Sequence, residues 1–183
     1  MVQTNIKIPA ELFAPAESSR FEGEWEVALL EAGPDDYAFA EPLTWAVDVT
    51  NTGDALLVQG VVKGTGTTAC ARCLEDVVYQ IEGQVEGFFL LNEETQAPDD
   101  MDDDEFDVLP ESHEIDLVPL LTAAVLMDVE DVPLCKDDCL GLCPQCGANL
   151  NEGPCACGAD PALEEFAREA NPFSALANLK FDE

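Results

Sequence analysis

Eight cysteines offer the clearest chemistry in this 183-residue chain. Six of them lie close together near the C-terminal end, and two lie far upstream with the two-residue spacing of a tight turn. The eight are Cys70, Cys73, Cys135, Cys139, Cys143, Cys146, Cys155 and Cys157. Thiolates presented from turns bind tetrahedral zinc, with metal–sulfur bonds of about 2.3 Å. The sequence therefore predicts zinc as the bound cofactor.

Eight thiols suffice for two tetrahedral sites, but their spacing does not fix which cysteines share an ion. The preferred site is a compact zinc knuckle made of Cys143, Cys146, Cys155 and Cys157. Cys139 is an alternative to either member of the second pair in that knuckle. A second site would join Cys70 and Cys73 to Cys135 and Cys139, and would tie the upstream strands to the tail.

Two other roles for Cys70 and Cys73 remain open: packed or free thiols, and a redox pair. Redox pairs of this spacing usually lie at a helix N-terminus, which lowers one thiol pKa. Here β-pattern lies on both sides, and the charges of Glu75 and Asp76 oppose thiolate formation.

A catalytic zinc needs an open position and usually histidine or carboxylate ligands. His113 is the only histidine, and it lies in an acidic stretch outside the cysteine run. No phosphate-binding glycine motif is present. We therefore expect closed, structural sites, a protein that is not an enzyme, and no small-molecule substrate.

The elements that position the cysteines point to two parts. Residues 1–130 are expected to form an α+β domain with an antiparallel, barrel-like β-sheet and one packed helix. Residues 131–183 are expected to form the cysteine-rich zinc module, with helices from Asp160-Pro161 and Asn171-Pro172. Alternation and β-forming residues predict strands at 24–30, 43–49, 55–69 and 77–91, in a meander.

Several local features refine this expectation. One helical turn is possible at 9–13, and apolar spacing predicts a helix over 115–129. Ser112 or Asp116 would cap that helix, and Pro119 would lie in its first turn. Glycines inside the strand at 55–69 predict bends or bulges there. The acidic tract 92–105 is interpreted as a solvated loop, because it lacks the glycine turn and the ligand spacing of a calcium loop.

The charge balance narrows the choice of partner. Thirty-nine acids and seven bases give a formal net charge of −32. Binding to bare nucleic-acid phosphates needs clustered Lys and Arg, which are scarce here. The acidity fits either solubility in a salty cytoplasm or attraction to a basic partner such as a ribosomal protein. No signal peptide or membrane span is evident, so we expect a cytoplasmic protein with reduced thiols and no membrane partner.

Several segments together resemble the bacterial YceD family. They are Cys70-Ala71-Arg72-Cys73-Leu74, Ile115-Asp116-Leu117, the run from Cys139 to Asn151 with Cys155-Ala156-Cys157, and Asn171-Pro172-Phe173 near the end. The similarity spans about residues 20–180 and is closest to the cysteine-bearing branch. Because other members lack the tail cysteines, the resemblance implies that zinc gives structural support.

The resemblance also implies a function. It indicates a non-enzymatic factor of ribosome biogenesis that supports accumulation of large-subunit ribosomal RNA, through binding of rRNA or ribosomal proteins. The alternative is a zinc-stabilised adapter for a basic protein partner, without RNA contact. Arg72 is the candidate partner-binding residue, and otherwise an ordinary surface residue of a hairpin. We expect the large aromatics to lie in the core and not to stack on bases, namely Trp25, Trp45, Phe88 and Phe89.

Overall fold

The computed structural model describes residues 4–92, 94–95, 101–102, 105–155 and 157. The chain forms two compact units. The first comprises residues up to Ala71 and Glu75–Cys135, and the second comprises Arg72–Leu74 and the chain from Lys136 onward. The helices expected from Asp160 and Asn171 lie outside the described residues. The same holds for parts of the acidic tract, namely 93, 96–100 and 103–104.

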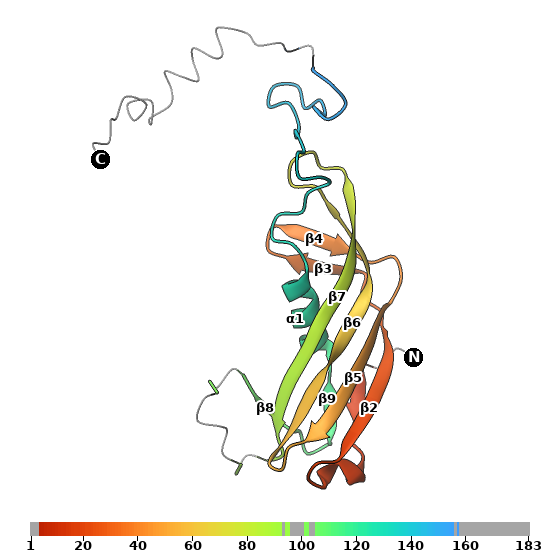
Figure 1. The fold of residues 1–183 in the computed structure, drawn as a ribbon, viewed down its shortest axis with the longest axis vertical. Coiled ribbons are helices and arrows are strands. Elements are labelled where there is room, and N and C mark those ends of the chain that lie inside the picture. Colours follow the sequence, from red (N-terminus) through yellow and green to blue (C-terminus); the bar gives the residue numbers. More distant parts are fainter. Residues whose placement is uncertain (1–3, 93, 96–100, 103–104, 156, 158–183) are drawn as a thin grey trace, which may run out of the picture. The chain divides into compact units, whose positions relative to one another are not determined.

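The first unit is mostly antiparallel β-sheet with one α-helix (Figure 1). Its elements are β1 (Asn5–Lys7), the 3-10 helix η1 (Ala10–Phe13), β2 (Ser18–Trp25), β3 (Leu29–Ala32), β4 (Asp35–Ala38), β5 (Leu43–Asn51), β6 (Ala55–Ala69), β7 (Asp76–Leu90), β8 (Asp107–Val108), β9 (Glu114–Asp116) and α1 (Val118–Asp128). The helical turn expected at 9–13 is present as η1.

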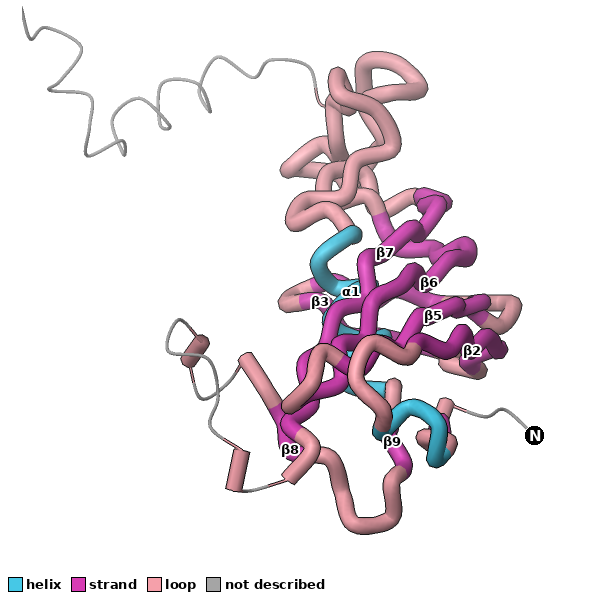
Figure 2. The backbone as a smooth tube through the Cα atoms, turned by 60° about the horizontal axis from the view of Figure 1, so that its bottom comes forward, coloured by secondary structure: helices cyan, strands magenta, loops and turns pink. Residues whose placement is uncertain are grey.

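Two long strands, β6 and β7, form the largest hairpin of the main sheet. β6 and β7 pair antiparallel over their full length, from Ala69 opposite Asp76 to Ala55 opposite Leu90. β5 lies on the other side of β6, and β2 pairs with β5 (Figure 2). β4 joins the far end of β6 through a single residue pair, and β3 follows β4. The meander of long strands expected from the sequence is thus present.

The sequence predicted a barrel-like sheet, and this prediction is wrong. Closing a barrel requires the outermost strands to pair with each other. In the described residues, β2 pairs with β5 alone and β3 pairs with β4 alone, so the sheet stays open. β1 pairs with β9 in a separate two-stranded sheet. The short β8 pairs parallel with β7, which is the exception to the antiparallel order.

Three local expectations need correction. The strand expected at 24–30 is the end of β2 and the start of β3, because 18–25 pairs with β5 as one strand. The helix expected from 115 begins at Val118, because Ile115 pairs with Ile6 in the small sheet. The glycines of β6 cause no bulge in its register, since each paired residue opposes one partner. Gly60 instead allows close approach of β5: a Cβ there would lie 2.1 Å from the Ala46 carbonyl oxygen.

The start of α1 follows the expected pattern in part. Pro119 lies in the first turn, where a missing amide costs nothing. The Asp116 carboxylate accepts a hydrogen bond from the Val118 amide at 3.0 Å, although Leu117 occupies the N-cap position. The helix packs its Leu121 and Val125 side chains into the core.

The core lies between α1 and the sheet and includes three of the four aromatic residues expected there. Trp25, Trp45 and Phe89 are buried, as expected, and Phe88 is half-buried. None of the helices in the described part of the chain has the length and apolar character needed to cross a membrane.

Candidate metal centres

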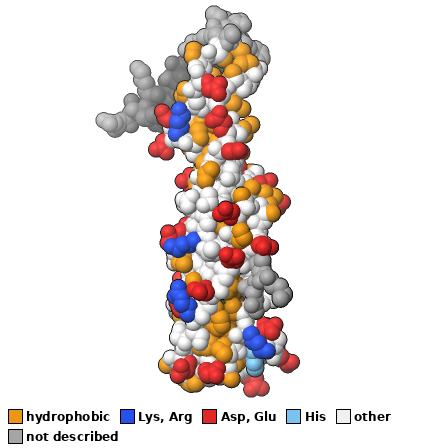
Figure 3. Space-filling model, turned by 90° about the vertical axis from the view of Figure 1, so that its right-hand side faces the viewer, with side chains coloured by type: hydrophobic (Ala, Val, Ile, Leu, Met, Phe, Trp, Pro, Cys, Tyr) orange, Lys and Arg blue, Asp and Glu red, His pale blue; other side chains and the backbone are white. Residues whose placement is uncertain are grey.

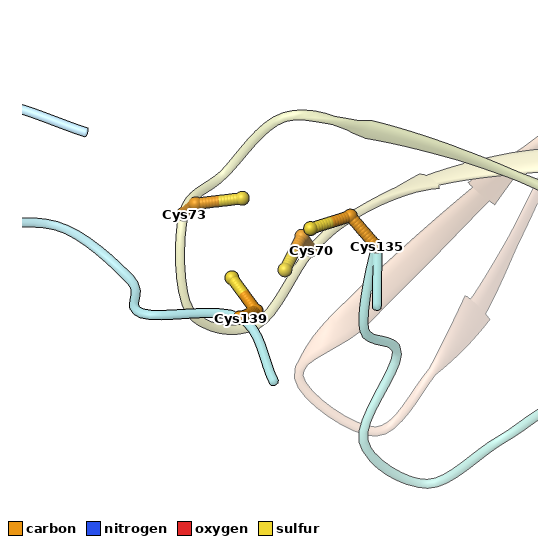
Figure 4. Close-up of side chains that lie close together, drawn as sticks. All are labelled: Cys70, Cys73, Cys135 and Cys139. Carbon is orange, nitrogen blue, oxygen red and sulfur yellow. The ribbon is translucent and has the colours of Figure 1, made fainter. Parts of the chain in front are cut away.

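The turn between β6 and β7 presents the first pair of thiols. Cys70 directly follows β6, and its amide donates to the Glu75 carbonyl at 2.8 Å, which closes the turn. The ligand atoms of Cys70, Cys73, Cys135 and Cys139 all lie within 4.8 Å of one another. Figure 4 shows the four sulfur atoms pointing toward a common centre. A regular tetrahedron with metal–sulfur bonds of about 2.3 Å has sulfur–sulfur edges of about 3.8 Å, so small shifts would close this site around an ion.

The second group of thiols comes from a small hairpin and the loop behind it. The Cys143 amide donates to the Ala148 carbonyl at 2.8 Å, and the Gly147 amide donates to the Cys143 carbonyl at 2.9 Å. Gly147 has a φ of 72°, in the left-handed region that favours glycine, and this lets the turn close. The ligand atoms of Cys143, Cys146, Cys155 and Cys157 again lie within 4.8 Å of one another.

The cysteines therefore fall into the two sets of four that the sequence suggested, and both sets could hold a metal ion. Cys139 belongs to the first set and not to the knuckle. None of the eight, all of which the structure describes, is joined in a disulfide. Within the described residues, no other group of three or more His, Cys, Asp or Glu side chains is gathered closely enough to bind an ion.

The electrostatics of the knuckle favour a cation. Hydrogen bonds from the backbone amides of Cys146 and Gln145 lower the pKa of the Cys143 thiol to about 6. A hydrogen bond to the Cys146 sulfur, together with burial, raises the pKa of Cys157 to about 12. The Cys157 amide lowers the pKa of Cys155, but hydrogen bonds to the Cys143 and Cys146 sulfur atoms, burial and the charge of Cys143 together raise it overall. Four thiolates this close repel one another, so complete ionisation requires a positive ion.

Two asparagines, whose role the sequence pattern does not predict, organise the region around Cys139. Asn151 donates from Nδ2 to the Cys139 sulfur at 3.3 Å, and its Oδ1 accepts from the Leu140 amide at 2.9 Å. Asn149 Oδ1 in turn accepts from Asn151 Nδ2 at 2.9 Å. Hydrogen bonds to ligand atoms orient them and tune the bound metal. Asparagines inside a cysteine-rich hairpin are the only sequence signal for such a role, and that signal is weak.

Arg72 is exposed but bound to its own chain. Its Nη1 donates to the Cys139 carbonyl at 3.0 Å and to the Asp137 carbonyl at 3.5 Å. Its own carbonyl accepts from the Leu142 amide at 3.1 Å. These contacts give Arg72 a structural role beside Cys139, a candidate metal ligand. Its role in partner binding stays a prediction.

His113 has a structural environment in the first unit. Its ring lies 4.8 Å from the ring of Phe13, and its backbone pairs with Ile8 and Pro110. It belongs to neither group of candidate ligands. Both centres therefore offer sulfur atoms only.

Comparison with known proteins identifies relatives. A family model described as large ribosomal RNA subunit accumulation protein YceD matches residues 58–180. A chloroplastic large ribosomal RNA subunit accumulation protein YCED homologue of Arabidopsis thaliana is 31% identical over 150 residues, covering 68% of this chain and 46% of that relative. An uncharacterised protein of Mycobacterium tuberculosis is 31% identical over 106 residues, covering 58% of this chain and 50% of that relative.

The chain spans about half the length of these curated relatives. No solved structure matches it. The family model covers more than half of the chain, and it includes the whole cysteine run, all of β7 and β6 from Val58 onward. The resemblance seen in the sequence is confirmed, and the chain belongs to the YceD family.

Proposed function

We propose that this protein is a non-enzymatic factor of ribosome biogenesis that supports the accumulation of large-subunit ribosomal RNA. The observation that carries the proposal is the family match over residues 58–180, since the family is named for that role. The sulfur-only donor sets add support, because tetrahedral sites closed by four thiolates leave no position for a substrate.

We further propose that its direct partner is a basic ribosomal protein and not bare rRNA. The chain carries a net charge of −32. On the face in Figure 3, basic side chains stand apart from one another among acidic ones. Four of the five Lys and Arg residues in the described part of the chain already bind groups of their own chain: Arg20 pairs with Asp48, Lys63 with Glu82 and Lys136 with Asp138, and Arg72 binds carbonyls. A surface with such scarce cations suits a cationic partner better than phosphates.

We propose zinc as the ion of both cysteine clusters. Soft thiolates in sets of four select zinc over hard cations such as calcium and magnesium. The ion would supply the positive charge that lets all four sulfur atoms of each set ionise. Because reduced thiols are required, a reducing compartment such as the cytoplasm is the expected location.

Depletion of the protein in the cell that makes it tests the function. The ratio of large- to small-subunit rRNA should fall and should recover with a re-introduced copy. Crosslinking in those cells, with and without nuclease treatment, tests the partner. A crosslink to a basic ribosomal protein that survives the nuclease supports the proposal. An unchanged rRNA ratio would refute the function, and crosslinks to RNA alone would refute the protein partner.

A further inference from the structure

The outer edge of β7 carries backbone groups that the sheet does not use. β7 pairs with β6 along one side in an unbroken register. Along the other side, in the described part of the chain, it pairs with β8 only at Phe89 and Leu90. An edge strand with unpaired amides and carbonyls is a ready template for another strand.

Two hydrogen bonds show which residues of β7 turn their backbone amides and carbonyls away from β6. The Glu82 amide donates to Asp128 Oδ2 at 2.8 Å, so it faces α1 and not β6. Opposite it, the Lys63 carbonyl accepts from Thr44 Oγ1 on β5. Because antiparallel pairs alternate with period two, Gln84 and Glu86 also turn their amides and carbonyls away from β6.

A groove of about 470 Å³ lies between this edge and α1. Its lining residues are Glu82, Gln84, Glu86, Leu120, Ala123, Ala124, Met127 and Asp128. On α1 the apolar members recur at the spacing of one helix face, and Met127 is 87% exposed. α1 lies alongside β7 in Figure 1, and its backbone at Ala124 approaches Gly83 closely. A helix beside an open strand edge is the arrangement that binds extended peptides in several domain types.

The acidic side chains of the groove favour a positively charged occupant. Glu86 provides a carboxylate to the groove, the Glu82 carboxylate is shared with Lys63, and the Asp128 carboxylate accepts from the Glu82 amide. The helix face beside them offers apolar surface. A second copy of this chain would bring another 32 negative charges, and RNA would bring phosphates. Both are disfavoured by like-charge repulsion.

We propose that this groove binds an extended segment of a basic protein, added as a strand to the edge of β7. Alternate side chains of that segment face opposite sides of the sheet. Lys or Arg at every second position would lie beside Glu82 and Glu86, and the apolar residues between them would contact α1. The proposal rests on the proposed function, because it assigns the docking surface for the basic ribosomal partner.

Binding of a designed peptide to the full-length protein tests the proposal. The probe is a labelled nine-residue peptide in which lysine alternates with valine, measured by fluorescence polarisation. Its controls are a peptide of the same composition with the lysines in one block and a version with N-methylated backbone. The alternating peptide should bind at least about tenfold tighter than either control, because only it can form both cross-strand charge pairs and backbone hydrogen bonds.

Variants of the protein locate the site. Gln84→Pro removes one outward amide and no β6–β7 hydrogen bond, so affinity should fall about tenfold while the circular dichroism spectrum stays unchanged. Glu86→Lys should weaken binding by at least a similar factor, and Glu24→Lys, the same change on β2 outside the groove, should have less than about a threefold effect. If Gln84→Pro unfolds the sheet, the affinities of Glu86→Lys and of the N-methylated peptide still test whether the segment binds in the groove.

Equal affinities for the three peptides, or equal effects of Glu86→Lys and Glu24→Lys on peptide affinity, would show that the groove does not bind a basic strand. The groove and the proposed function fail in different ways. If a ribosomal protein crosslinks in cells to residues outside the groove, and Glu86→Lys leaves its capture unchanged, the groove is wrong and the function stands. If depletion leaves the rRNA ratio unchanged, the proposed function is wrong. The peptide-binding measurements then test the groove as a binding site on their own.

Discussion

The side-chain amide of Asn151 donates a hydrogen bond to the sulfur of Cys139 at 3.3 Å, while its carbonyl holds the Leu140 amide. Asn151 lies 12 residues beyond Cys139, within the cysteine-rich run. Asn149, the residue paired with Leu142 beside Cys143 in the hairpin, accepts a hydrogen bond from Asn151 in turn. One chain of hydrogen bonds therefore reaches from the hairpin of one cysteine cluster to a ligand candidate of the other.

Removing that contact should weaken metal binding at the cluster of Cys70, Cys73, Cys135 and Cys139. Asn151→Ala is expected to lower affinity there about 10- to 100-fold, since it deletes a hydrogen bond that orients a ligand. Asn151→Asp should do at least as much, because its carboxylate cannot donate and adds negative charge. Competition with a chelator measures the effect, and Gln145→Ala, an exposed side-chain amide in the same hairpin, is the control. Equal metal affinities for all of these proteins would show that Asn151 does not contribute to metal binding at this cluster.

Substituting one pair of cysteines at a time should remove one ion at a time. Cys143→Ser with Cys146→Ser should lower bound zinc by about one equivalent and leave the β-sheet folded, because the ligands of each site belong to one cluster. Cys70→Ser with Cys73→Ser should remove the other equivalent. Elemental analysis with circular dichroism measures both. Loss of both ions from either double variant, or of neither, would show that the partition is wrong.

Zinc binding at the knuckle should release fewer protons at neutral pH than in acid. The pKa of Cys143 lies at about 6, so this thiol is already ionised at pH 7.5 and is protonated at pH 5. Cys155 and Cys157, whose pKa values are raised, keep their protons at both values. Binding should therefore release about one proton more at pH 5, and affinity should fall more steeply below pH 6.

Calorimetry in buffers of different ionisation enthalpy measures this proton release. The protein with Cys70→Ser and Cys73→Ser isolates the knuckle for the measurement. The same proton count at both pH values would contradict the role of the Cys146 and Gln145 amides in stabilising the Cys143 thiolate.

Arg72 should matter for stability more than for partner binding. Arg72→Ala removes a charged donor from the Cys139 carbonyl, and should cost the cysteine-rich unit about 1–2 kcal/mol. Arg20→Ala breaks an exposed ion pair and should cost less than about 1 kcal/mol. Thermal unfolding with zinc bound compares the two. A large loss of ribosomal-protein capture with unchanged stability would instead make Arg72 a contact residue, as the sequence alone suggested.

The sequence predicted the strands whose pattern is local. The strand expected at 55–69 coincides with β6, and the hairpin with β7 follows because Cys70 to Cys73 interrupts two long runs of β-forming residues. The openness of the sheet was not predictable in this way, because barrel closure depends on which distant strands meet at the edges. The start of α1 was misplaced for the same reason, since the pairing of Ile115 with Ile6 is a long-range contact.

The candidate site was predictable to a greater extent. Ligand types and spacing suggested both sets of four cysteines, because thiolates presented from tight turns suit tetrahedral sites. Spacing left open whether Cys139 belongs to the knuckle, and only the fold places it with Cys70, Cys73 and Cys135. The roles of Asn149, Asn151 and Arg72 depend on hydrogen bonds made through the fold, and residue type does not specify them. The groove beside β7 depends on where α1 packs, which periodicity does not reveal.

X-ray absorption spectroscopy on the intact protein, with elemental analysis of the same sample, tests the metal-centred account most directly. Two zinc ions per chain are expected, each surrounded by four sulfur atoms at about 2.3 Å. Nitrogen or oxygen in the first coordination sphere, or a metal-free protein whose cysteines are joined in disulfides, would contradict it.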